Sequence, residues 1–205
     1  MENNNIIRNY EEAIREIKQA YIYKRYKEEL GGRKKEDIFN NYPYFFIVGA
    51  GISSKVVKTA GRIIDECKSI YKKSYGEIDT QVKKENCDEY SYWFNKAFPH
   101  KEIRRIYLEK LIVGKQIPEE VLKLANILSS KEITNLVVTP NFDKFIYQAL
   151  NLYGEKNILL SERPENVTKL NINSDSLNIL HVHGTYEYYD CCNLKSWLKV
   201  VQQVR

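Results

Sequence analysis

The hydrophobic pattern alternates between short, continuous apolar runs and longer stretches in which apolar residues recur every three or four positions. Continuous runs of the kind found in buried strands lie at Phe45 to Val48, Thr134 to Thr139, Ile158 to Ser161 and Asn178 to His183. The first run is unbroken and bounded by glycine, which favours a central parallel strand over an edge strand. Strands that alternate with helices predict an α/β fold built on a parallel sheet.

Helical spacing marks the segments outside these strands. Apolar residues near the N-terminus predict a helix within residues 1–32, ended by a glycine pair. We expect this amphipathic helix to cover its own sheet, and a contact with a partner subunit is the alternative. Residues 55–128 are predicted to be mostly helical, which leaves residues 44–54 and 133–185 to form the core that carries the sheet.

Length and charge narrow the class of protein. A chain of 205 residues can bury one core and a small lobe. The net charge of +5 is mild, and the short basic clusters lie beside acidic residues, so we expect no direct binding of nucleic acid.

No apolar run approaches the roughly 20 residues that a membrane span needs, and no signal peptide precedes the first helix, so a cytoplasmic protein is expected.

The cysteine pattern argues against a structural zinc site. The four cysteines include no Cys-x-x-Cys pair. The adjacent Cys191 and Cys192 are poor partners for one disulfide, because a bridge between neighbours is strained. We therefore expect no metal site and a reducing compartment.

A glycine turn follows the first predicted strand and is the first candidate site. It consists of Gly49, Ala50, Gly51, Ile52 and Ser53. Its glycines carry no Cβ, so they permit positive φ and let a ligand approach the backbone closely. A strand, a glycine turn and a helix N-terminus form the usual cradle for a pyrophosphate, and a plain strand-to-helix turn is the alternative. From these residues alone the two interpretations have equal weight.

Two further polar motifs follow later strands. Thr139-Pro-Asn-Phe-Asp143 ends one strand, and His183-Gly184 ends another. Ligands of parallel α/β sheets bind beyond the carboxyl ends of the strands, so we expect these motifs and the glycine turn to meet at one crevice.

Each of these polar residues also has a structural interpretation. Asn141 and Asp143 have side chains of the kind that cap a following helix. His181 and His183 alternate along a strand and should face the same side, either as half of a metal site or as core histidines. We expect His181 to be structural, whereas the glycine that follows His183 and the order of the motifs favour a catalytic role for His183.

The three motifs, in this order and with about ninety residues between the first two, resemble the sirtuin family, in which Thr-Gln-Asn-Ile-Asp stands in place of Thr139 to Asp143. The resemblance covers roughly residues 44–185. The residues of the three motifs look most like those of the sirtuin-like NAD-cleaving domains of bacterial anti-phage defence systems. It implies a Rossmann-like sheet with helices on both faces and the helical insert, residues 55–128, as the smaller lobe.

The resemblance also implies roles for individual residues. Asn141 would bind the nicotinamide ribose or position a water, Asp143 would orient the carboxamide, and His183 would be the general base. The chemistry agrees, because breaking the nicotinamide–ribose bond develops oxocarbenium character and the pyridinium leaving group needs no proton. A histidine has a pKa suited to a base near neutral pH. The residues that would hold NAD+ are Gly49, Ala50, Gly51, Ile52, Ser53, Thr139 and Phe142.

The activity implied is an NAD+ glycohydrolase that releases nicotinamide and ADP-ribose and depletes NAD+ in abortive infection. The zinc ribbon of protein deacylases is missing, which favours water over acyl-lysine as the acceptor. An NAD-dependent deacylase and a non-catalytic sensor of NAD+ or ADP-ribose are the alternatives. The chain ends about twenty residues after Gly184, before the later strands of sirtuins, so we expect a domain truncated at its C-terminus.

The same resemblance implies an assembly. We expect a homo-oligomer, with a HerA-type DNA-translocating ATPase or another defence protein as partner. Tyr21, Tyr23 and Tyr26 on the N-terminal helix offer a contact surface, because tyrosine is enriched in interfaces. Packing of these tyrosines on the helical insert of their own subunit, or simple exposure at its surface, is an equally weighted alternative.

Overall fold

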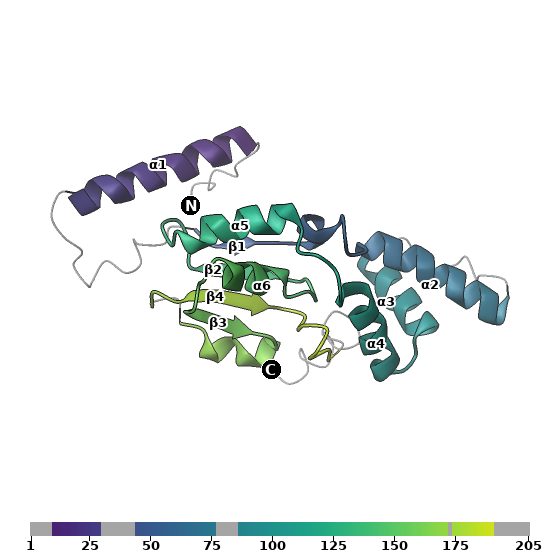
Figure 1. Cartoon of the computed structure of the whole chain (residues 1–205). Helices are drawn as coiled ribbons and strands as arrows, with labels where there is room; N and C mark the ends of the chain where they lie inside the picture. The colour runs from purple at the N-terminus through teal and green to yellow at the C-terminus, as the bar shows by residue number, and fades with distance from the viewer. Residues whose placement is uncertain (1–9, 30–43, 77–85, 172–173, 191–205) are drawn as a thin grey trace, which may run out of the picture.

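The structure, a computed structural model, describes residues 10–29, 44–76, 86–171 and 174–190 (Figure 1). Its centre is a sheet of four parallel strands in the order β1-β2-β4-β3. Helices flank the sheet, so the predicted Rossmann-like α/β class is confirmed. The strands are β1 (Phe46–Ile47), β2 (Leu136–Thr139), β3 (Ile158–Ser161) and β4 (Leu177–His181).

The strand β1 differs from its prediction. It is two residues long, and within the described part of the chain it lies at the edge of the sheet, paired only with β2. Phe45 is 58% exposed and Ile47 is 73% exposed. The expectation of a central strand is therefore wrong for the described residues, because an apolar run reports hydrophobicity and does not report how many neighbours a strand has.

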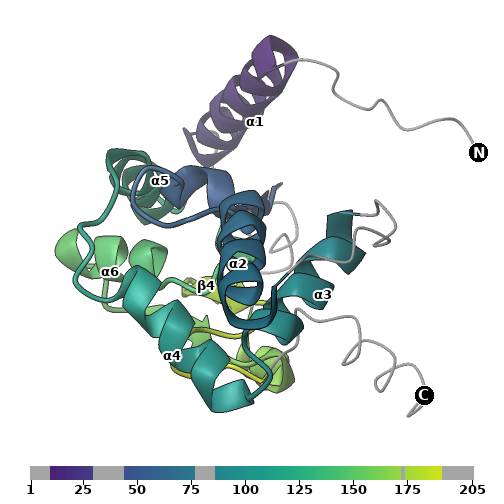
Figure 2. The same ribbon diagram turned by 90° about the vertical axis from the view of Figure 1, so that its right-hand side faces the viewer.

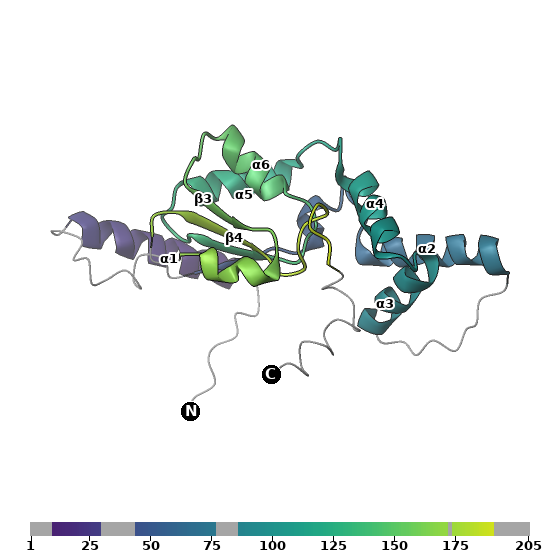
Figure 3. The same ribbon diagram turned by 90° about the horizontal axis from the view of Figure 1, so that it is seen from below.

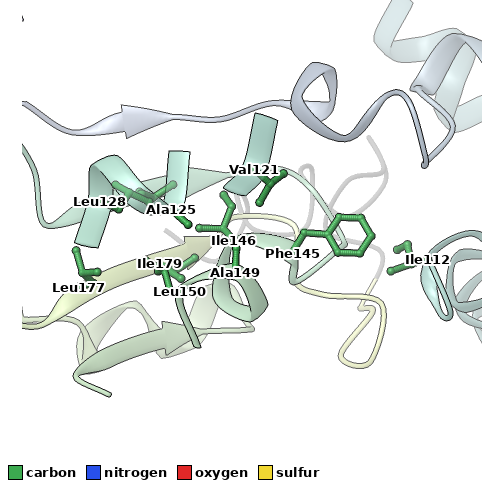
Figure 4. Packing of buried hydrophobic residues seen from close by; sticks show 11 residues of the cluster. Ile112, Val121, Ala125, Leu128, Phe145, Ile146, Ala149, Leu150, Leu177 and Ile179 are labelled. Atoms are coloured by element: carbon green, nitrogen blue, oxygen red, sulfur yellow. The ribbon is translucent and has the colours of Figure 1, made fainter. Parts of the chain in front are cut away.

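One face of the sheet is covered by two helices, α5 (Glu119–Ser129) and α6 (Phe145–Leu152), which lie on the same side of β3 and β4 in Figure 3. Their apolar faces meet the sheet in the larger core cluster (Figure 4). The cluster contains Ile112, Val121, Ala125, Leu128, Val137, Phe145, Ile146, Ala149, Leu150, Leu177 and Ile179.

The opposite face of the sheet meets the 3-10 helix η3 (Pro164–Lys169) and the loop after it. Asn178 alternates with Ile179 on β4, so its side chain points away from α5 and α6. The Asn178 Oδ1 atom accepts a hydrogen bond from the N–H of Asn171 at 2.8 Å. A buried polar side chain thus fastens the loop to this face.

A second core cluster lies beyond the carboxyl ends of the strands. The arrowheads in Figure 1 point toward α2 (Ala60–Tyr75), α3 (Asn86–Ala97) and α4 (Lys101–Ile112), which stand together in Figure 2. Aromatic side chains of α3, Trp93 and Phe94 among them, are buried at the centre of this lobe. The buried residues of the cluster are Ile63, Cys67, Trp93, Phe94, Leu108 and Tyr189.

The boundary of the helical insert follows from this packing. The predicted insert, residues 55–128, includes α5, but Val121, Ala125 and Leu128 of α5 belong to the cluster on the sheet. The smaller lobe therefore consists of α2, α3 and α4, and α5 is a layer of the sheet domain.

The N-terminal helix α1 (Tyr10–Glu29) forms where it was predicted. Its Ile14 and Ile22 side chains are exposed, so at these two positions the helix does not cover the sheet. The side chains of Tyr21, Tyr23 and Tyr26 lie outside the described residues. Within the described ranges, no helix has both the length and the apolar character to cross a bilayer.

Candidate active site

The ends of β1, β2 and β4 meet at a pocket of about 380 Å³ between the two core clusters. The predicted convergence of the three motifs is therefore present in the structure. Phe142 packs against both clusters and marks the seam between them. The residues from the motifs that line the pocket are Ala50, Ser53, Pro140, Asn141, Phe142, Asp143 and His183.

The glycine turn after β1 has a different shape from the one predicted. Ala50–Ser53 forms the 3-10 helix η2, and a loop separates it from α2, which begins at Ala60. Gly49 has φ −88°, and neither Gly49 nor Gly51 has positive φ. A Cβ on either glycine would meet nothing within 4 Å, so the main chain of the turn is open at both positions without needing a left-handed residue.

Asp143 is held by donors from two directions. Ser53 Oγ donates to Asp143 Oδ2 at 3.0 Å, and the N–H of Phe145 donates to Asp143 Oδ1 at 3.2 Å. The second bond satisfies the N–H of Phe145, the first residue of α6, although the N-cap residue of that helix is Lys144 and Asp143 also lines the pocket. Burial raises the pKa of the Asp143 carboxyl, and these two hydrogen bonds oppose the rise.

Asn141 is fixed through its main chain and its side chain. Its N–H donates to Thr139 Oγ1 at 3.1 Å, and its Nδ2 donates to the carbonyl oxygen of Gly49 at 3.2 Å. The main-chain oxygen of Asn141 lies 2.9 Å from His181 Nδ1. These contacts connect the loop after β2 to the ends of β1 and β4.

Four residues predicted to hold a cofactor are not among those that line the pocket: Gly49, Gly51, Ile52 and Thr139. Thr139 is buried, and its hydroxyl donates to the carbonyl oxygen of Val48 at 2.6 Å. It therefore ties β2 to β1 and supports Asn141. Ile52 packs against the larger core cluster.

The two histidines near the end of β4 lie in different environments. His181 is the last residue of the strand and is only 2% exposed. His183 follows the strand, lines the pocket and faces Phe142, with 6.4 Å between the ring centroids. Burial lowers the pKa of His183, so its ring is neutral near neutral pH. Because the strand ends at His181, the alternation along a strand that predicted a shared face does not extend to His183.

The opposite wall of the pocket was not found from the sequence. It comes from the loop before α2 and from the smaller lobe, where helical spacing indicated only core positions. Lys58 donates to Glu66 Oε2 at 2.8 Å, and the Tyr107 hydroxyl donates to the same oxygen. The remaining lining residues are Val57, Lys58, Ala60, Ile63, Tyr90, Leu108, Leu111 and Ile112.

No protein-family model matches the chain, and no curated protein matches it either. Within the described ranges, no group of three or more His, Cys, Asp or Glu side chains is placed to hold a metal ion. Cys191 and Cys192 lie outside those ranges.

Proposed function

We propose that the protein is a sirtuin-like NAD+ glycohydrolase that cleaves NAD+ to nicotinamide and ADP-ribose. One observation carries this proposal: Asn141, Asp143 and His183 share one apolar pocket beside the open backbone of the glycine turn. The order of the motifs along the chain, which resembles that of sirtuins, supports the choice of NAD+ as the substrate.

The pocket suits the nicotinamide end of a dinucleotide. Its volume of about 380 Å³ lies within the range of small-molecule sites, and a few polar groups interrupt mainly apolar walls. The apolar walls accommodate an aromatic ring, and the open turn at Gly49 and Gly51 leaves room for the diphosphate to approach the main chain.

The proposed reaction breaks the bond between nicotinamide N1 and ribose C1′. The bonding electron pair moves to the pyridinium nitrogen, which leaves as neutral nicotinamide. A water oxygen bonds to C1′, and the water's proton is taken by a base. The positive charge that develops on the ribose makes positioning and exclusion of bulk water the main tasks of the protein.

The residues present fit these tasks. His183 is neutral near neutral pH and can accept the proton from water. Asn141 Nδ2 donates a hydrogen bond to the carbonyl oxygen of Gly49, so the Asn141 carboxamide has a fixed direction at the pocket. Asp143, with a raised pKa, offers hydrogen-bonding oxygens to the nicotinamide carboxamide. In a cell this activity would deplete NAD+, which fits a role in abortive infection.

The test measures the release of nicotinamide by the purified full chain, with chromatography to quantify the product. We expect Asn141→Ala and His183→Ala to lower the rate by about 10²-fold or more, the usual loss for a positioned catalytic group. The matched controls are Asn151→Ala and His100→Ala, which remove the same side-chain types from exposed positions and should retain the wild-type rate.

The alternatives predict other outcomes. Release that depends on an acylated peptide and yields O-acyl-ADP-ribose indicates a deacylase. Binding of NAD+ in calorimetry without any release of nicotinamide indicates a sensor. Equal rates for His183→Ala and His100→Ala overturn the assignment of His183.

A further inference from the structure

His181 is a buried histidine that the proposed chemistry does not use. It pairs in register with Thr139 of the neighbouring strand, so the two side chains flank the same loop. The main-chain oxygen of Asn141 can only accept a hydrogen bond, so His181 Nδ1, 2.9 Å away, must carry the proton. Burial lowers the pKa of His181 to about 4, so the ring is a neutral donor at physiological pH.

Asn141 lies in a loop, between β2 and α6, and has no regular secondary structure to hold it. Its N–H is held by Thr139 Oγ1 and its carbonyl oxygen by His181 Nδ1. The preceding Pro140 has no N–H to contribute. The peptide groups on both sides of Asn141 are thus fixed by two strand-end side chains.

We propose that His181 is a positioning residue of this site, whose Nδ1–H orients the Asn141–Phe142 peptide and thereby holds the Asn141 carboxamide at the pocket. The inference rests on the proposed function, because it assigns importance to the direction of the Asn141 side chain. Phe142 lines the same pocket, so rotation of this peptide would displace two wall residues together.

The size of the expected effect follows from geometry. A displacement of about 1 Å in a catalytic group can lower a rate by about 10²-fold. Loss of the Nδ1 donor should therefore lower kcat far more than it raises KM.

Three substitutions separate positioning from packing. His181→Asn places an amide N–H near the position of Nδ1, so it can still donate to Asn141. His181→Gln places its amide nearer the position of Nε2, and His181→Leu has no donor. His100→Asn is the matched control, because His100 is an exposed histidine outside the pocket.

We expect His181→Asn to retain kcat within about threefold, while His181→Gln and His181→Leu lose about 10- to 100-fold at nearly unchanged KM. Equal kcat per folded molecule in all three variants overturns the proposal and leaves His181 a packing residue. If His181→Leu does not fold, the comparison of His181→Gln with His181→Asn gives the same decision.

A second measurement does not depend on turnover. In protein labelled at asparagine, the nuclear magnetic resonance signals of the Asn141 side-chain amide report its environment directly. These signals should shift in His181→Gln and stay near their wild-type positions in His181→Asn. The same signals in both variants overturn the proposal. If the wild-type protein leaves NAD+ intact, the proposed function fails, and this measurement still decides whether His181 positions Asn141.

Discussion

Burial decides how the histidines near the end of β4 titrate, and His183 makes the clearest prediction. Burial lowers its pKa below the usual 6.5, so the neutral form needed of a base is already present at neutral pH. We expect kcat/KM to be flat from about pH 7 to about pH 8 and to fall on the acid side with a midpoint below 6.5. An acid limb with its midpoint above 7 would contradict the role of His183 as a buried base.

His181 predicts a pH dependence of stability. Its pKa is about 4 in the folded protein and near 6.5 in the unfolded chain. At pH values between these two pKa values, His181 binds a proton in the unfolded state but not in the folded state. The free energy of unfolding therefore falls as the pH decreases. The difference in pKa corresponds to about 3 kcal/mol across this window.

The measurement is urea unfolding of the wild type and His181→Asn at about pH 7 and about pH 4. Asparagine does not titrate, so the wild type should lose about 3 kcal/mol relative to the variant on acidification. The raised pKa of Asp143 acts in the opposite direction, but it is present in both proteins and cancels in the comparison. An unchanged difference at the two pH values would show that His181 is not buried in its neutral form.

At the scale of the elements, the turn after β4 requires glycine at position 184. Gly184 has φ +80°, and a Cβ there would lie 2.7 Å from the main-chain oxygen of Tyr188. Gly154 has φ +79° with nothing within 4 Å of its Cβ position, so it isolates the cost of the backbone conformation alone. We expect Gly154→Ala to lower the free energy of unfolding by about 1 kcal/mol and Gly184→Ala to lower it distinctly more.

Thermal and urea unfolding of the two glycine variants, with nicotinamide release as a second readout, tests this prediction. Gly184→Ala should also slow nicotinamide release because His183 precedes it, whereas Gly154→Ala should leave the rate unchanged. Equal stability losses in the two variants would mean that the turn can relax around the added methyl group.

The positions of the helices and strands along the chain could be predicted better than the elements that each of them packs or pairs with. Periodicity located β3 closely, β2 and β4 within about two residues, and α1 inside the range predicted for it, because hydrophobic spacing is a local property. The edge position of β1 depends on which strand pairs with it, and no local pattern carries that information. The same limit explains α5, whose apolar face resembles those of the lobe helices but packs on the sheet.

At the scale of the whole molecule, the candidate site is a seam between two cores. The polar side was predictable, because parallel strands bring Asn141, Asp143 and His183 to one edge. The apolar side was not, since Tyr90 and Leu108 come from a lobe whose placement depends on tertiary packing. The support of Asn141 by His181 was also missed, because that contact joins the ends of two strands.

The most direct test of the central claim is NAD+ cleavage in water enriched with heavy oxygen, with mass spectrometry of the products and a control for exchange into added ADP-ribose. The account predicts equal amounts of nicotinamide and ADP-ribose, with one heavy oxygen in the ADP-ribose and none in the nicotinamide. It also predicts that Asn141→Ala and His183→Ala form this labelled product about 10²-fold more slowly or worse, while Asn151→Ala and His100→Ala form it at the wild-type rate. Intact NAD+ in the wild-type reaction, or ADP-ribose formed without the heavy oxygen, would contradict the proposal that this pocket hydrolyses NAD+.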